Sequence, residues 1–468
     1  MSQYLRRLQA IGRFLAAVFL ALAYIFALPA GAQTALTNGG LHTGDIAPAG
    51  DSESWTFTAG AGDGLFIRVG STNFTPRIRL FDGTNAQIAE TTSGNTLVRD
   101  GWLTLTATNG GNYTVIVSAS FAGQTGTYGL HFGRAPGAFS VPDNDEGGEL
   151  GNGSAQAGTL SLGDLDLWSF SAQAGEGLML RVGATNFTPW LRLYGPTGAL
   201  VAEETTGNTL ARDGVITLAA PATGAYTLVV SATYSGQAGG YALHWVKAPG
   251  AITITPGDEG GGLVNGAVHA AALTLGDLDA WTFAAGAGDG LMIRMGATGL
   301  TPWLRLYGPS GALVAEETSG NNLVRDGEIT RQAPATGTYT LVVSARYSGQ
   351  TGPYELHLAK TPGDFVVSDG DEGGDLINGS GHTGNLTLGD LDLWRFTAAG
   401  GESVVFRVGA TNFTPWIRLY GPTGALVDST TSGNTLVRDG TVAATPPMRV
   451  PTRSLSRPPS PARRGDTG

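Results

Sequence analysis

Three pairs of aspartates are the residues of this 468-residue chain best suited to chemistry. The members of each pair stand two positions apart: Asp164 and Asp166, Asp277 and Asp279, and Asp390 and Asp392. Residues two apart on a β-strand share a face, so each pair could offer carboxylate oxygens to calcium or act as general acid and base. Three copies argue against catalysis, because one site per enzyme is usual. A polar strand edge that enters the core at Trp168 is the favoured interpretation.

Further carboxylates lie in glycine-rich stretches and form a second calcium candidate. They are Asp143, Asp145, Glu146, Asp258, Glu259, Asp369, Asp371 and Glu372. Their spacing departs from that of a recognised calcium loop, which makes this candidate the weaker one. Histidine is not expected to add a ligand. His131, His244 and His357 alternate away from the apolar face and are expected at the surface, while His42, His269 and His382 lack metal-pair spacing.

Rows of Trp, Arg and Tyr alternate with leucines along one predicted strand in three copies. The rows are Trp190, Arg192 and Tyr194; Trp303, Arg305 and Tyr307; and Trp416, Arg418 and Tyr420. Leu191 and Leu193 face the other way and are expected in the core, which leaves the first row on the outer face. Exposed aromatics beside arginine are the usual anchors of binding surfaces. Packing of the row against a loop or a neighbouring domain is an equally good interpretation.

The elements that must position these residues form a repeat of 113 residues. Trp55, Trp168, Trp281 and Trp394 are successively 113 apart, without insertion or deletion. Within a unit the hydrophobic period is two, as in Trp168 and Phe170, and Gly- and Pro-rich turns separate the segments. Short strands over about 110 residues predict an antiparallel β-sandwich of the jelly-roll or Greek-key kind. We therefore expect an all-β chain of tandem sandwiches, arranged as beads on a string.

The repeat divides the chain into six segments. We expect a signal peptide at 1–32, because three arginines flank the start of the apolar run 14–28 and Ala30-Gly31-Ala32 supplies a cleavage site. Units follow at 33–144, 145–257 and 258–370, and an incomplete one at 371–445. Residues 446–468 are basic and proline-rich and are expected to be disordered. A neighbouring reading frame can be written that encodes the missing end of the last unit, so we hypothesise a frameshift near Thr445.

Composition excludes several classes of function. The chain has no cysteine, which rules out disulfides and thiolate chemistry, and its net charge of −11 argues against nucleic-acid binding. No Gly-x-Ser-x-Gly elbow or phosphate-binding Gly-x-x-x-x-Gly-Lys occurs, so we expect no enzyme and no cofactor apart from possible calcium. No later segment is apolar enough to span a membrane. We expect a monomer that is secreted, periplasmic or at the cell surface of a bacterium.

The repeated motifs resemble the bacterial pre-peptidase C-terminal domain. The resemblance rests on Gly-Asp-x-Asp-x-Trp-x-Phe from Gly163, on Leu-Arg-Leu-Tyr-Gly-Pro-Thr-Gly at 191–198 and on Thr-Gly-Ala-Tyr-Thr-Leu-Val-Val at 223–230. It implies β-sandwich modules that accompany secreted proteases and are related to collagenase collagen-binding domains, where calcium is held near the interdomain linker. The repeats fill residues 33–445 and leave no room there for a peptidase.

These observations favour a non-catalytic string of binding modules. Its partner would be an extracellular matrix, a polysaccharide or a protein surface. The alternative is a truncated ancillary region of a larger secreted peptidase, hydrolase or surface protein. A purely structural spacer is the third interpretation.

Overall fold

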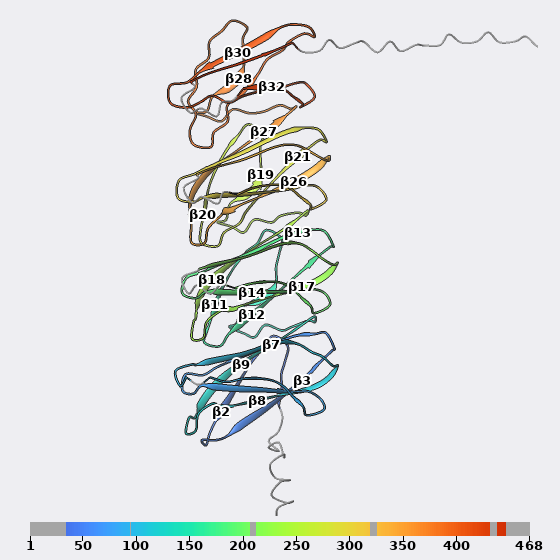
Figure 1. The fold of residues 1–468 in the computed structure, drawn as a ribbon, viewed down its shortest axis with the longest axis vertical. Coiled ribbons are helices and arrows are strands. Elements are labelled where there is room, and N and C mark those ends of the chain that lie inside the picture. The colour runs from blue at the N-terminus through green and yellow to red at the C-terminus, as the bar shows by residue number, and fades with distance from the viewer. Residues whose placement is uncertain (1–33, 94, 206–211, 319–324, 431–437, 446–468) are drawn as a thin grey trace, which may run out of the picture.

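The computed structural model describes residues 34–93, 95–205, 212–318, 325–430 and 438–445. The predicted signal peptide and the predicted frameshifted tail lie outside these residues. The described chain forms a column of four units that follow one another from the N-terminal, blue end to the C-terminal, red end (Figure 1). None of the described residues is helical, and none belongs to a helix that could cross a membrane.

Units 1 to 3 are each built from a five-stranded and a four-stranded sheet. In unit 1 the strands of the five-stranded sheet follow the order β1 (Thr34–Ala35), β3 (Ser52–Ala59), β8 (Gly111–Ala119), β5 (Pro76–Phe81), β6 (Gln87–Thr91). The strands of the four-stranded sheet follow the order β2 (Gly40–Ile46), β9 (Gly126–Ala135), β4 (Gly64–Gly70), β7 (Asp100–Thr106). All pairs are antiparallel except the short parallel contact of β1 with β3. The predicted class, tandem antiparallel β-sandwiches, is confirmed.

Units 2 and 3 repeat this topology strand for strand. In unit 2 the five-stranded sheet has the order β10 (Gly147–Glu149), β12 (Leu165–Ala172), β17 (Gly224–Ala232), β14 (Pro189–Tyr194), β15 (Leu200–Glu204). Its four-stranded sheet has the order β11 (Ala155–Leu160), β18 (Gly239–Ala248), β13 (Gly177–Ala184), β16 (Asp213–Ala219). In unit 3 the five-stranded sheet has the order β19 (Gly260–Gly262), β21 (Asp279–Ala285), β26 (Gly337–Ala345), β23 (Pro302–Tyr307), β24 (Leu313–Thr318). Its four-stranded sheet has the order β20 (Val268–Leu273), β27 (Gly352–Thr361), β22 (Gly290–Ala297), β25 (Asp326–Gln332).

The core of each unit lies between its two sheets. In unit 2 the inward residues predicted from the period of two are buried: Trp168 and Phe170 on β12, and Leu191 and Leu193 on β14. Trp245 on β18 reaches them from the opposite sheet, with its ring centroid 3.8 Å from that of Phe170. Alternation therefore identified correctly which side of each strand meets the core.

Unit 4 has only three two-stranded ladders among its described residues. They pair β28 (Gly373–Asp375) with β29 (Leu393–Arg395), β30 (Val404–Gly409) with β33 (Asp439–Ala444), and β31 (Ile417–Tyr420) with β32 (Leu426–Thr430). In unit 2, β17 and β18 occupy the middle of the two sheets, and no described strand does so in unit 4. Phe413 is consequently 37% exposed, whereas its counterpart Phe187 is fully buried.

Adjacent units are in direct contact, sheet against sheet. Outer-face residues of the four-stranded sheet of unit 2, including Met179 and Val246, pack against Trp303, Tyr307 and Val342 of the five-stranded sheet of unit 3. A corresponding cluster joins Phe66 of unit 1 to unit 2. The beads of the predicted string thus form a continuous stack of alternating sheets (Figure 1).

A pair of glycines allows the backbones to meet at each junction. A Cβ on Gly183 of unit 2 would lie 2.1 Å from the carbonyl oxygen of Leu275, and one on Gly276 would lie 2.1 Å from the amide nitrogen of Gly183. Gly276 also has a φ of 76°, which a side chain would disfavour. The pairs Gly70 with Gly163 and Gly296 with Gly389 repeat the contact. Glycine at these positions is required by the stack rather than by a turn alone.

The glycine contact gives a test of the stacking. We expect Gly183→Ala to push units 2 and 3 apart and to lower the stability by about 1–3 kcal/mol, because the new methyl group overlaps backbone. The matched control is Gly409→Ala, since a Cβ at this equivalent position of unit 4 meets no atom within 4 Å. Calorimetry and small-angle X-ray scattering would measure the melting temperature and the length of the particle. Equal effects of the two substitutions would contradict the junction.

Candidate functional site

The Trp-Arg-Tyr rows of units 2 and 3 lie inside the junctions. Trp190, Arg192 and Tyr194 are 9%, 3% and 5% exposed. The corresponding residues of unit 3, Trp303, Arg305 and Tyr307, are 6%, 5% and 5% exposed. The prediction of an exposed outer face is therefore wrong for these two rows, because the next sheet of the column covers them. Packing against a neighbouring domain, the alternative interpretation, is what the structure has.

Each residue of the row has a defined contact in the junction. The ring of Tyr194 lies 4.6 Å from that of Phe66 in unit 1, and the Arg192 guanidinium donates to Thr104 Oγ1 at 2.7 Å. The same guanidinium lies 4.0 Å from the ring centroid of Trp190, and the Trp190 indole donates to Glu203 at 2.6 Å. Burial lowers the pKa of Arg192 to about 10. The cation–π contact and the hydrogen bonds offset this cost.

The third row, in unit 4, is only partly covered. Trp416 is 51% exposed, whereas the side chain of Arg418 is only 7% exposed and Tyr420 is partly buried. Arg418 still lies 3.3 Å from the Trp416 ring centroid and donates to Glu328 of unit 3 at 2.5 Å. The row is therefore docked on unit 3 through its arginine, with its indole turned partly to solvent.

The second aspartate of each predicted pair closes a buried hydrogen-bond chain. Trp168 Nε1 donates to Tyr241 Oη at 3.0 Å, and the Tyr241 hydroxyl donates to Asp166. Trp281, Tyr354 and Asp279 repeat the chain in unit 3. In unit 1 Glu53 takes the place of the aspartate. This carboxylate therefore anchors the Trp-Tyr pair of the core, as the favoured interpretation of a polar strand edge implied.

The two carboxylate oxygens of the first aspartate of each pair make different contacts, one within its own unit and one with the preceding unit. Asp164 Oδ2 accepts from the backbone nitrogen and hydroxyl of Ser161 at 2.9 and 3.0 Å, which fixes the turn before β12. Its Oδ1 faces His131 Nδ1 of unit 1 at 3.0 Å. Asp277 is held in the same way by Thr274, and its Oδ1 lies 3.0 Å from His244 Nδ1. The aspartate thus reaches across the junction.

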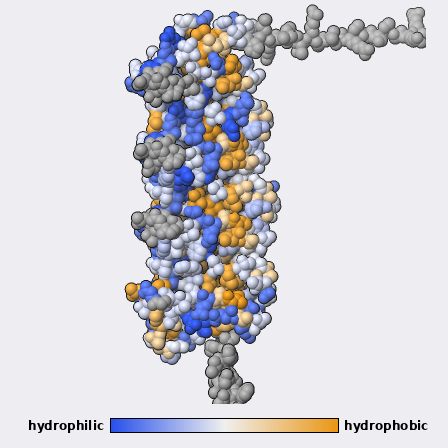
Figure 2. Space-filling view, in the orientation of Figure 1, coloured by the Kyte–Doolittle hydropathy of each residue, from blue (hydrophilic) through white to orange (hydrophobic). Residues whose placement is uncertain are grey.

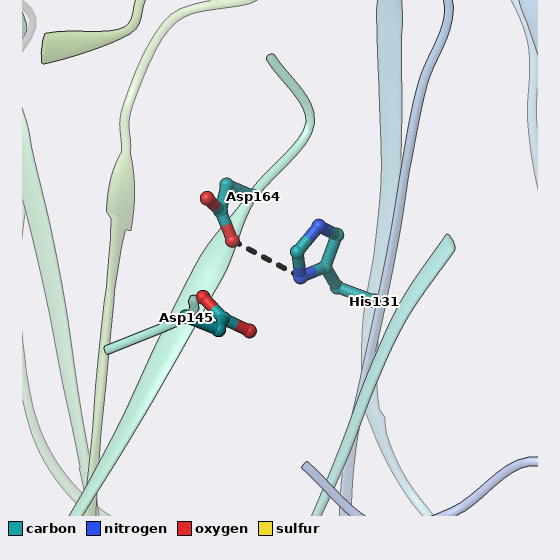
Figure 3. Close-up of side chains that lie close together, drawn as sticks. All are labelled: His131, Asp145 and Asp164. Atoms are coloured by element: carbon teal, nitrogen blue, oxygen red, sulfur yellow. Dashed lines mark ion pairs between the residues drawn. The ribbon is translucent and has the colours of Figure 1, made fainter. Parts of the chain in front are cut away.

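Three side chains converge at every junction: a histidine of one unit, the first aspartate of the pair in the next unit, and an aspartate of the acidic, glycine-rich connector between the two units. The three sets are His131, Asp145 and Asp164; His244, Asp258 and Asp277; and His357, Asp371 and Asp390. Figure 3 shows His131 and Asp164 pointing toward each other, with Asp145 beside them. Within each set one ligand atom per residue lies within 4.8 Å of the others. The expectation that these histidines lie at the surface is wrong, since all three are 4–5% exposed.

An oxygen-only cluster adjoins the histidine set. It joins Asp145 and Glu146 of the connector to Asp166, and Asp258 and Glu259 to Asp279 in the next unit. Oxygen donors alone are what calcium takes. Burial, and then the charge of Asp164, raises the pKa of Asp166 to about 9. Its Oδ1 is buried without a hydrogen-bond partner. These residues fit a cation, so the two calcium candidates of the sequence, pair and connector, meet in one cluster.

Sequence reasoning missed the histidines although a signal was present. His131, His244 and His357 keep the 113-residue period, as do the aspartates that they face. Alternation placed them correctly on the outer face of β9, β18 and β27. It could not show that the next unit covers this face, because the period of a strand carries no information about a neighbouring domain.

A groove runs along the flank of the junction between units 3 and 4. Its volume is about 1010 Å³, and its lining includes Leu313, Arg331, Tyr420 and Leu426. Leu313 and Leu426 are equivalent residues of successive units and are 49% and 51% exposed; Leu200 of unit 2 is 46% exposed. The space-filling view shows hydrophobic patches at successive levels of the column (Figure 2). Exposed leucine is therefore a repeated feature of the flank.

The comparisons with known proteins found structural neighbours only. No protein-family model and no curated protein matches the chain. A pre-peptidase C-terminal domain of collagenase from Bacillus anthracis is 23% identical and covers 22% of this chain and 95% of its own, with a TM-score of 0.19. A secreted protein of Eubacterium rectale, described as putative, is 13% identical over 50% of this chain and 84% of its own, with a TM-score of 0.19.

A third structural neighbour is larger than the chain. It contains the M60 catalytic domain and two CBM51 domains of ZmpB from Clostridium perfringens, is 9% identical, and covers 65% of this chain and 33% of its own, with a TM-score of 0.14. The neighbours thus include a pre-peptidase C-terminal domain. Membership of that family, and the count of four copies of its domain, stay predictions.

The buried rows predict an asymmetry between equivalent tryptophans. We expect Trp303→Ala to lower the free energy of unfolding by about 3–5 kcal/mol, because the indole is buried between two units. Trp416→Ala should cost clearly less, since half of that side chain is already exposed. Calorimetric unfolding of both variants measures the difference. A smaller cost at position 303 than at 416 would contradict the stacking of unit 3 on unit 2.

The oxygen-only cluster predicts stabilisation by calcium. We expect millimolar calcium to raise the melting temperature of the full chain relative to chelator, because a cation compensates carboxylates that repel one another when buried. The double variant Glu146→Gln, Glu259→Gln should lose most of this shift. Glu149→Gln, an exposed carboxylate outside the cluster, should keep it. An unchanged melting temperature of the parent chain with calcium would count against the site.

Proposed function

We propose that the chain is a non-catalytic protein that acts outside the cell, where its stacked β-sandwich units bind an extracellular matrix, a polysaccharide or a protein surface. The observation that carries the proposal is the recurrence of one sheet-on-sheet junction along the column. A repeated junction holds equivalent surfaces at a fixed spacing. Such an array suits contact with an extended partner better than the enclosed pocket of an enzyme.

Buried arginines support a stiff column. Arg68 of unit 1 donates to the carbonyl oxygen of Ala232 in unit 2 at 2.9 Å and pairs with Asp100 at 2.7 Å, where both side chains are almost fully buried. Arg181 of unit 2 makes the same bond to Ala345 of unit 3 at 2.8 Å. Displacing either unit would leave a buried charge with fewer partners, which is costly. Bending at these junctions is therefore opposed.

The flank, rather than the Trp-Arg-Tyr rows, is the surface proposed for binding. The Trp-Arg-Tyr rows of units 2 and 3 are buried in the junctions and cannot contact a ligand, whereas Leu200, Leu313 and Leu426 are exposed in equivalent positions. A partner that contacts several of them at once gains from the effective concentration of the later contacts, which raises avidity by about 10²–10⁴. The spacing then matters as much as the strength of one contact.

A second candidate function is that of a spacer in a larger secreted peptidase, hydrolase or surface protein. The same stiff column favours it, since rigid stacked units can hold an attached domain away from a surface. Under this alternative the flank has no ligand. The sequence feature that supports export under both candidates is the predicted signal peptide, cleaved before Gln33.

Retention on insoluble matrices tests the binding function. We expect the full chain to be retained on collagen or on a polysaccharide, and the triple variant Leu200→Ser, Leu313→Ser, Leu426→Ser to lose at least tenfold in retention. The matched control, Val264→Ser, Val366→Ser, Ile377→Ser, removes apolar residues elsewhere that are at least about as exposed, and should keep the retention. Loss in both variants would contradict the assignment to the flank. No retention of the parent chain on any matrix would favour the spacer.

A further inference from the structure

We propose that each junction of the column holds one Zn²⁺ ion, bound by Nδ1 of a histidine from one unit and by carboxylates of the connector and of the next unit. The three sites are His131, Asp145 and Asp164; His244, Asp258 and Asp277; and His357, Asp371 and Asp390. The inference goes beyond binding of a matrix, because it concerns what clamps the units together.

The donor set selects the class of metal. Imidazole nitrogen and carboxylate oxygen are both donors that zinc accepts in proteins, and three protein ligands leave a fourth position for water. An imidazole ligand disfavours calcium and magnesium, which take oxygen donors, and among divalent metals it suits zinc and its neighbours in the first transition row. The oxygen-only cluster beside each histidine set therefore has a different preference, although the two share the connector aspartate.

The second junction carries the clearest geometry. His244 Nδ1 lies 3.0 Å from Asp277 Oδ1 and 3.9 Å from Asp258 Oδ2. Both Nδ1 and Asp277 Oδ1 are buried, yet neither makes a hydrogen bond. Ligand atoms that share a zinc ion at about 2.0–2.2 Å stand roughly 3–3.5 Å apart, so these two atoms face one another at the distance that a common ion requires.

The state of the buried groups also suits a metal. Nδ1 of His244 and Oδ1 of Asp277 face one another without an aligned hydrogen bond, so both atoms are open to an ion. The side chains of His244 and Asp277 are 7% and 2% exposed. The carboxylates of Asp258 and Asp277 both face this imidazole, and carboxylates brought together away from water repel one another, which leaves the site short of positive charge. A divalent cation supplies the missing charge.

The ligands of one site come from three separate segments. His244 lies on β18 of unit 2, Asp258 on the connector, and Asp277 in the turn before β21 of unit 3. A bound ion therefore ties both units and the connector together. The same holds at the other two junctions. At the third, His357 Nδ1 and Asp390 Oδ1 are 3.6 Å apart, which makes that site the loosest.

Zinc stoichiometry tests the proposal. The untagged full chain is stripped with chelator, supplied with millimolar calcium to fill the oxygen-only clusters, and dialysed against Zn²⁺ for elemental analysis. We expect about three zinc ions per chain, one for each cluster. The triple variant His131→Ala, His244→Ala, His357→Ala should bind none of the three. The matched control His42→Ala, His269→Ala, His382→Ala removes the other three histidines and should bind all of them.

A second variant distinguishes loss of the zinc ligands from loss of the fold. Asp164→Asn, Asp277→Asn, Asp390→Asn keeps the size of the side chain and an oxygen for the turn, and should lower the zinc content while the circular dichroism is unchanged. Cobalt replacing zinc should give visible absorption bands that the histidine variant lacks. Zinc bound equally by parent and histidine variant, zinc displaced by calcium, or no zinc bound by the parent would each overturn the proposal.

Discussion

The contact on which the structure depends is the burial of one sheet face against another at the junction between units. Each inner unit has two such faces: the four-stranded sheet covers the next unit, and the five-stranded sheet covers the preceding one. At the first two junctions a Trp and a Tyr bury aromatic area that would otherwise face water, and aromatic side chains dominate the energetics of such interfaces. The sandwich topology alone does not require this, since a sandwich with two polar outer faces would fold by itself.

The polar groups of the junction follow from that burial. Once a sheet covers Arg68, Arg181 and Arg192, each guanidinium must find partners, because an unpaired buried charge is costly. Each does so partly across the junction, on Ala232, Ala345 and Thr104. At the third junction Arg294 bonds to the carbonyl oxygen of Asp390 instead, and its side chain is 29% exposed. Hydrophobic contact thus holds the faces together, and the arginines fix their register.

The sequence predicted the fold of a unit but not the relation between units. The period of two and the repeat gave the sandwich and the inward direction of Leu191 and Leu193 correctly. The outward direction of Trp190 and Tyr194 was equally correct, yet the side chains are buried, because a strand's period distinguishes its two faces and says nothing of what lies beyond them. One signal was available: the first copy has Arg77, Arg79 and Phe81 in the row, and in the described structure its face is covered by no other unit.

The candidate site could be predicted only in part for the same reason. The paired aspartates were found because they stand two positions apart beside a repeated Trp, and the connector carboxylates because they cluster in glycine-rich links; the first aspartate of each pair lies in the turn before the strand rather than on it. The histidines belong to the preceding unit, about 33 residues earlier in the chain than the aspartate that they face. Only stacking brings them together. A site shared between two units is visible in a sequence as a common period, without any local spacing that would mark it as a site.

The junction between units and the candidate cation site share residues. Binding of a cation and the stiffness of the junction are therefore thermodynamically linked. Asp164 fixes the turn through Ser161, approaches His131 of the unit before, and adjoins the cluster that contains Asp166. A cation that binds only when both units are in register must favour that register by the free energy of its binding, and a stiff junction must in turn raise the affinity for the cation. Because the same three candidate ligands recur at all three junctions, a bound cation at each would couple the units along the whole column rather than at one position.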